Sequence, residues 1–253
     1  MSSSSVYVLV AHGSRDPRSQ LALDDLLVEV RACLAKTTPR SNLTDSTQAD
    51  ASVVAAAALE FAPTPLPEAI AAIVRATGAR VARLVPLFLQ AGVHAREDVP
   101  AAANIARELL RGVIDVEVLP PIGSYPAMEA ILAAQFARLQ SNVPNARRLL
   151  VAHGSRRPDG NDPVAKLAAR FDATVAFWAI APDLETQVAA LAAKDSRAIA
   201  IAPYFLFPGS ITDAIAARIT RLQASYPQLS IALAPPLNAI PQFSQLIVDL
   251  CCS

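Results

Sequence analysis

The stretch VYVLVAHGSR, residues 6–15, decides the fold. Its apolar, β-branched half is typical of a buried strand and brings His12 to the strand end. Gly13 then suits a tight turn, and Ser14 suits the cap of a following helix. Residues 149–156, LLVAHGSR, repeat the pattern, so two of the chain's three histidines occupy the same setting. We infer that the chain contains an internal repeat.

Strand and helix patterns alternate through both copies of the repeat. After the first strand, the first copy predicts a polar loop over 37–51 and further strands near residues 52–59, 80–88 and 113–119. It predicts helices over residues 16–36, 66–77, 94–111 and 127–140. The pattern restarts at residue 147, and PLFLQAG at 86–92 aligns with PYFLFPG at 203–209. We therefore predict an α/β protein of two tandem domains, residues 1–143 and 144–253, each with a mainly parallel four-stranded sheet flanked by helices.

The composition excludes several classes of protein. The 253 residues include 22 Lys and Arg against 22 Asp and Glu, so no basic field is present to attract nucleic acid. No apolar run reaches the roughly 18 residues of a membrane span, and the N-terminus lacks the features of a signal peptide. Three cysteines form neither a disulfide framework nor a metal-binding pair. We expect a soluble cytoplasmic protein that binds neither nucleic acid nor a membrane.

Three candidate ligands follow neighbouring strands of the first predicted sheet. His12 lies just past the first strand, Glu60 ends the second, and His94 lies just past the third. Ligands of open α/β sheets bind outside the carboxyl ends of the strands, so we expect these side chains to share one rim. Two imidazoles and a carboxylate can bind Fe²⁺, Co²⁺ or Ni²⁺, and imidazole can equally accept a proton near neutral pH.

Ordered motifs extend this pattern to a known family. AHGS at 11–14, EFAPTPL at 60–66 and FLQAGVHARED at 88–98 together resemble the sirohydrochlorin chelatases of the CbiX/SirB type. These are class II chelatases, related in fold to protoporphyrin ferrochelatase, and the long members fuse two chelatase-like domains. The resemblance covers nearly the whole chain. It implies catalysis by His12 and His94 of the N-terminal domain, with a degenerate second domain.

The resemblance also implies the reaction. We expect a lyase that inserts a divalent metal into sirohydrochlorin, with the metal as substrate and no permanently bound cofactor. Fe²⁺, on the route to sirohaem, is favoured because the chain lacks the histidine-rich stretch or iron-sulfur cysteine motif of long cobalt-pathway relatives. The alternatives are Co²⁺ insertion for cobalamin and a tetrapyrrole or metal carrier without catalysis.

Further residues are candidates for binding the macrocycle. Leu87 and Phe88 can supply apolar walls for a flat ring. The carboxylates of sirohydrochlorin require donors, for which Arg15, Arg18 and Arg96 are candidates. Asp98 lies four residues after His94 and is a candidate to orient its ring.

The second histidine motif lacks these partners. The repeat register aligns Ile211 with His94 and Phe177 with Glu60. We therefore expect His153 to be a structural remnant or a peripheral contributor. A fused pair of domains also resembles a dimer of half-length units, so we expect the chain to be a monomer.

Overall fold

The chain forms two four-stranded, fully parallel sheets that follow one another in sequence. The computed structural model describes residues 5–37, 53–112, 114–157, 159–194 and 196–252. All but the first residue of the predicted loop at 37–51 lies outside the described residues. The predicted α/β class and the two parallel sheets are confirmed.

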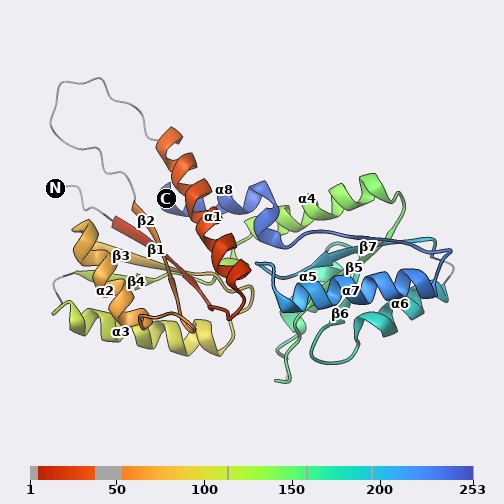
Figure 1. Ribbon diagram of the computed structural model, residues 1–253, viewed down its shortest axis with the longest axis horizontal. Helices are drawn as coiled ribbons and strands as arrows, with labels where there is room; N and C mark the ends of the chain where they lie inside the picture. Colours follow the sequence, from red (N-terminus) through yellow and green to blue (C-terminus); the bar gives the residue numbers. More distant parts are fainter. Residues whose placement is uncertain (1–4, 38–52, 113, 158, 195, 253) are drawn as a thin grey trace. The chain divides into compact units, whose positions relative to one another are not determined.

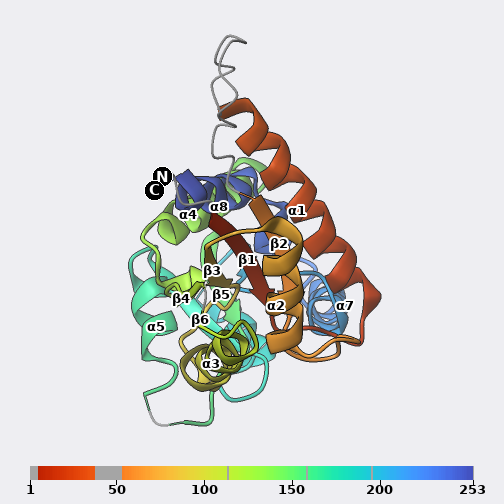
Figure 2. The ribbon, with the colours of Figure 1, turned by 90° about the vertical axis from the view of Figure 1, so that its left-hand side faces the viewer.

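The first sheet has the strand order β2-β1-β3-β4. Its strands are β1 (Ser5–Ala11), β2 (Val53–Ala58), β3 (Val81–Pro86) and β4 (Asp115–Val118). Helices α2 (Leu66–Thr77) and α3 (Val99–Leu109) lie on one face, and α1 (Pro17–Thr37) lies on the other (Figures 1 and 2). Because β1 lies between β2 and β3, its carboxyl end is flanked by theirs.

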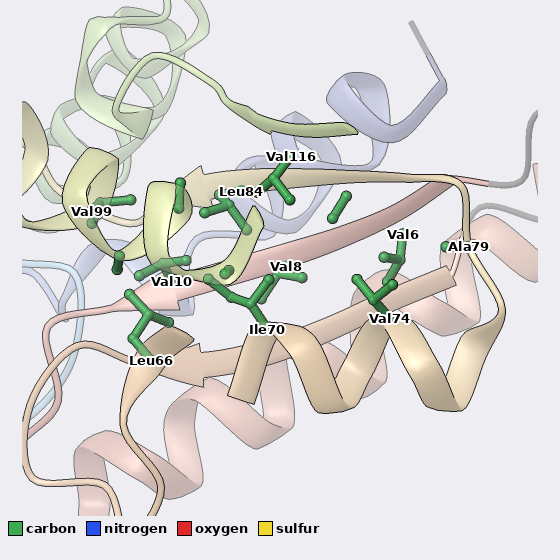
Figure 3. Close-up of a cluster of buried hydrophobic side chains, with 14 residues drawn as sticks. Val6, Val8, Val10, Leu66, Ile70, Val74, Ala79, Leu84, Val99 and Val116 are labelled. Atoms are coloured by element: carbon green, nitrogen blue, oxygen red, sulfur yellow. The ribbon is translucent and has the colours of Figure 1, made fainter. Parts of the chain in front are cut away.

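Alternation along β1 builds the core on the α2 and α3 face. Val6, Val8 and Val10 are fully buried among side chains from both helices, and Figure 3 shows them facing Leu66, Ile70 and Val74 of α2. Successive strand residues point to opposite faces, so Tyr7 and Leu9 belong to the other face, where they are also buried. Burial on both faces explains why β1 reads as a continuous apolar run.

The second sheet repeats this arrangement with the order β6-β5-β7-β8. Its strands are β5 (Arg147–Ala152), β6 (Ala173–Phe177), β7 (Ala198–Pro203) and β8 (Ser230–Leu233). Helices α6 (Leu184–Ala192) and α7 (Ser210–Ser225) share a core with one face, while α4 (Ala127–Asn142) contacts β7 and β8 and α5 (Asp162–Ala169) contacts β5 and β6. Helix α8 (Pro241–Cys252) ends the chain. Within the described ranges no helix is both long and apolar enough to cross a membrane.

The spatial units and the sequence repeat have different boundaries. The chain folds into two compact units, one of residues 1–125 with 244–253 and the other of residues 126–243. The boundary expected at 143/144 separates the two strand-helix repeats, whereas α4, which ends the first repeat, belongs to the second compact unit. The end of α8 belongs to the first unit. A split between repeats at 143/144 therefore stays a prediction about the sequence repeat.

The helix predicted over residues 94–111 is divided in two. Residues His94–Asp98 form a single π-helical turn, η1, in which the Val99 N–H bonds to the His94 carbonyl, and α3 follows directly. Pro100 lacks an N–H group, and its ring would clash with the carbonyl four residues earlier in a regular α-helix. The wider turn before Pro100 is consistent with that constraint, and π turns occur frequently at functional sites.

Candidate functional site

The turn after β1 is held tightly against the segment after β2. The Leu59 N–H bonds to the Ala11 carbonyl and the Glu60 N–H bonds to the His12 carbonyl, both at 2.9 Å. Gly13 has φ +89°, and a Cβ at this position would lie 1.9 Å from the Glu60 carbonyl oxygen. Only glycine satisfies both conditions. The backbone therefore fixes His12 and Glu60 next to each other.

The exit of β3 supplies the second imidazole. The Leu87 N–H continues the ladder to the Val10 carbonyl at 2.8 Å, and the Phe88 carbonyl accepts from the Gly123 N–H at 3.0 Å. The chain then reaches η1, whose first residue is His94. The side chain of His94 is 39% exposed, so its ring remains accessible beside the carboxyl end of β1.

His12 and His94 meet through their outer ring nitrogens. Their Nε2 atoms lie 3.2 Å apart, and the two rings are perpendicular with centroids 4.6 Å apart. The Nδ1 of His94 lies 2.7 Å from Oδ2 of Asp98, and the Nδ1 of His12 lies 3.1 Å from the Gly13 carbonyl oxygen. Both oxygens are acceptors, so each Nδ1 carries the hydrogen. In the neutral rings both Nε2 atoms then carry a lone pair, and the two atoms lie side by side.

This geometry suits a cation. Two adjacent lone pairs repel unless both nitrogens bind the same proton or the same metal ion. A metal with bonds of about 2.1 Å to adjacent nitrogens of a tetrahedron or octahedron holds them about 3.0–3.4 Å apart. The observed 3.2 Å lies in that range. The exposed carboxylate of Glu60 completes the group, since one ligand atom from each of the three residues lies within 4.8 Å of the others.

The two apolar candidates occupy different environments. Phe88 is half-buried and stacks on His94, with ring centroids 6.2 Å apart and planes inclined by 22°. Leu87 is only 3% exposed. Of these two side chains, Phe88 therefore has the surface that a flat ligand can touch.

The three candidate arginines also differ. Arg18 forms a fork with Asp16, at 3.0 Å through Nε and 2.6 Å through its terminal nitrogen, and this pairing lowers the pKa of the Asp16 carboxyl. Arg96 is exposed on η1. Arg15 lies over the ring of Phe61, with 5.2 Å between the guanidinium carbon and the ring centroid. Arg15 and Arg96 are thus the more available cations.

Phe61 is a rim residue that sequence reasoning missed. It is 55% exposed and has φ +56°, a left-handed conformation that is rare for a bulky side chain. The sequence signal was its place directly after Glu60, between a strand end and the proline cluster that starts α2. Nothing in the sequence alone indicated its backbone conformation or its contact with Arg15.

The second unit has a histidine at the equivalent strand end but lacks equivalents of Glu60 and His94. His153 directly follows β5 as His12 follows β1, and it is exposed. The alignment of Phe177 with Glu60 is wrong by two residues, because the N–H of Ala179 bonds to the His153 carbonyl as that of Glu60 bonds to His12. The strand register gives the same offset, because Ala58 pairs with Ala11 and Phe177 pairs with Ala152. Ala179 and Ile211 both lack a metal ligand, and among the described residues only the group around His12 could hold a metal through three side chains.

Several solved structures share this fold. SirB from Bacillus subtilis with Fe³⁺ is 22% identical with a TM-score of 0.77, covering 97% of this chain and 93% of that chain. The sirohydrochlorin chelatase SirB from Bacillus subtilis subspecies spizizenii, in complex with cobalt, is 21% identical with a TM-score of 0.70, covering 98% and 94%. CbiX, described as the terminal enzyme for the biosynthesis of siroheme in denitrifying bacteria, is 22% identical with a TM-score of 0.62, covering 96% of each chain.

Sequence comparison gives the family. No curated protein matches the chain. The CbiX family model, however, matches it twice, over residues 6–139 and 147–252. The first match contains His12, Glu60 and His94, and the second begins at β5, where the repeat restarts. With both halves matched, the chain belongs to the CbiX family.

Proposed function

We propose that this protein is a lyase that inserts a divalent metal ion into sirohydrochlorin. The observation that carries the proposal is the pair of Nε2 atoms 3.2 Å apart, with Glu60 beside them. Family membership supports the substrate, since a similar SirB is described as a sirohydrochlorin chelatase. The metal is a substrate that enters and leaves with each turnover.

The reaction exchanges one divalent cation for two protons. Two pyrrole N–H protons leave the macrocycle while the metal sheds ligands and meets the ring nitrogens. His12 and His94 hold the ion through Nε2, and each Nε2 that the metal leaves can accept one of the protons. The charge of the site is then unchanged, and the carboxylates of Asp98 and Glu60 offset the two imidazolium charges. Bulk water removes the protons before the next metal binds.

Fe²⁺ is our proposed physiological metal, which assigns the protein to sirohaem formation. The three histidines and three cysteines of the chain form no histidine-rich stretch and no cysteine cluster motif, features that would favour the cobalt pathway. Co²⁺ is the second candidate, because a similar SirB binds cobalt. Anaerobic assays with sirohydrochlorin and Fe²⁺, Co²⁺ or Ni²⁺, followed by absorbance, distinguish them. The highest kcat/KM is expected with Fe²⁺, and no insertion of any metal would exclude the chelatase function.

Turnover distinguishes an enzyme from a carrier. We expect many metallated products per protein molecule, and a loss of at least about 100-fold in rate in His12→Ala and His94→Ala. His153→Ala is the matched control, because His153 has the same strand-end setting without the other ligands. A single product per protein would favour a carrier, and a loss in His153→Ala equal to that in His12→Ala would contradict the assignment of the site to the first unit.

A further inference from the structure

The exposed ring of Phe61 is held in an unfavourable state. Its left-handed backbone, at φ +56°, is strained in a non-glycine residue, and more than half of its surface faces solvent. Burial would stabilise a phenylalanine, yet the following residues 62–65 are exposed as well. Neither the local backbone nor core packing accounts for an aromatic side chain here.

The position of Phe61 is nevertheless well fixed relative to the metal ligands. It directly follows Glu60, whose N–H bonds to His12 and whose carbonyl packs where Gly13 has no Cβ. Pro63 and Pro65 restrict the backbone of the next residues. The ring therefore lies on the rim of the site, attached to a rigid segment, which lowers the entropy cost of presenting it to a ligand.

Arg15 adds a positive charge to this ring. Its guanidinium is held over the aromatic face at 5.2 Å, and within the described parts of the chain no carboxylate pairs with it. Arg18, by contrast, is engaged by Asp16. A guanidinium stacked on a ring keeps its in-plane N–H donors free for an incoming anion. Arg15 and Phe61 thus combine an apolar planar surface with carboxylate donors.

We propose that Phe61 and Arg15 form a docking platform for the substrate macrocycle on the rim of the His12–His94 site. The ligand class is a flat conjugated ring that carries carboxylates: the ring edge packs on Phe61 while one peripheral carboxylate binds Arg15. This inference rests on the proposed function and assigns to the pair a role in substrate affinity, separate from metal binding.

The test measures binding of metal-free sirohydrochlorin by absorbance titration. Phe61→Leu keeps an apolar side chain without the aromatic face, and Arg15→Gln removes the charge; each is expected to raise Kd about tenfold. Phe61→Tyr keeps the ring and should stay within about twofold of the wild type. Leu21→Ala and Arg138→Gln, which change an exposed apolar and an exposed cationic side chain outside the site, are the matched controls and should leave Kd unchanged.

Three further measurements separate docking from other causes. Co²⁺ binding in the absence of macrocycle should be the same in all these variants, and their melting temperatures should agree within a few degrees. Arg15→Gln should not alter binding of the fully esterified macrocycle, because the ester has no carboxylate to pair.

Two results would overturn the platform. If Phe61→Leu and Arg15→Gln bind sirohydrochlorin as the wild type does, the platform is wrong while the chelatase function stands. If the wild type itself neither binds nor metallates sirohydrochlorin, the proposed function fails and the platform fails with it.

Discussion

His94 depends on Asp98 for the orientation of its ring. The 2.7 Å contact between Nδ1 and Oδ2 places the hydrogen on Nδ1 and leaves Nε2 free to face His12. A carboxylate behind a ligating histidine also raises the basicity of that histidine toward a metal. We therefore propose Asp98 as a positioning residue that would act on a bound metal through His94.

Asp98→Asn should weaken Co²⁺ binding about tenfold, because a neutral amide is a weaker acceptor for the Nδ1 hydrogen and can rotate to offer its N–H instead. The measurement is a titration of metal-free protein, followed in the visible absorption bands of bound Co²⁺. Glu97→Gln is the matched control, since it removes the same charge one residue away on η1. Equal weakening in both variants would show that net charge, and not orientation, is responsible.

Gly13→Ala should destabilise the fold by about 2 kcal/mol or more and disturb the site, because it combines a positive φ with a Cβ 1.9 Å from the Glu60 carbonyl oxygen. Gly78→Ala has a positive φ and open space and should cost about 1 kcal/mol. Gly92→Ala has neither problem. Chemical denaturation of the three variants measures their free energies of unfolding. Equal losses in Gly13→Ala and Gly78→Ala would contradict the close approach of the Gly13 backbone to the Glu60 carbonyl.

Among the elements, the two copies of the repeat differ most clearly where the helix after the third strand of each sheet begins. In the first unit the segment after β3 forms the π turn η1, which carries both His94 and Asp98. The matching segment after β7 starts the regular helix α7 at Ser210, with Ile211 in the place of His94. Among the described residues, the three-residue group that could hold a metal ion therefore lies in the copy with the irregular turn.

The start of helix α6 is stabilised by a side-chain cap. Asp183 caps this helix by accepting a hydrogen bond from the Thr186 N–H at 2.8 Å. Hydrogen bonding to Thr186 lowers the pKa of the Asp183 carboxyl. Asp183→Ala should lower the free energy of unfolding by about 1 kcal/mol at neutral pH. Because the folded-state pKa is lowered, this stabilisation is present above the unfolded-state pKa and is lost as the pH falls through the folded-state value.

The measurement is urea denaturation of wild type and variant at neutral and acidic pH. The difference in unfolding free energy should shrink toward acid. Asp183→Asn, which keeps a capping oxygen without the charge, should retain most of the stability. A deficit in Asp183→Ala that stays constant with pH would contradict a contribution from the ionised carboxylate.

The whole chain contains two repeats of one fold. The family model matches each repeat separately, and each contains a complete parallel sheet. Helix α4 nevertheless belongs to the second compact unit and the end of α8 to the first. The ends of the two repeats thus do not coincide with the ends of the two compact units.

We accordingly predict a monomer. Sedimentation equilibrium at micromolar concentration should give a mass near that of one chain, 26.6 kDa. The physical reason is that the fusion already supplies the second domain that a half-length protein would obtain by pairing. A stable species of twice that mass would contradict the prediction.

The sequence by itself determined most of the fold. The apolar run of residues 6–10 indicates a buried strand, and the helical spacing of apolar residues over 66–77 indicates a helix with one buried face. Burial of these faces stabilises the two elements. The repeated AHGS motif predicted two sheets, and strand ends predicted that His12, Glu60 and His94 would meet. The structure brings these three together within 4.8 Å. Their roles in catalysis stay a prediction.

Only the tertiary structure decided the details on which chemistry depends. The adjacent Nε2 atoms and the contact of Arg15 with Phe61 join residues from different segments. The π turn before Pro100 departs from the single regular helix that the side-chain spacing predicted. The two-residue shift that places Ala179 opposite His153 is set by the pairing of β6 with β5, which strand periodicity does not report. The spacing of apolar residues in the sequence indicates which side chains are buried. The distances between strand ends depend on strand register and on the backbone path of the connecting turns.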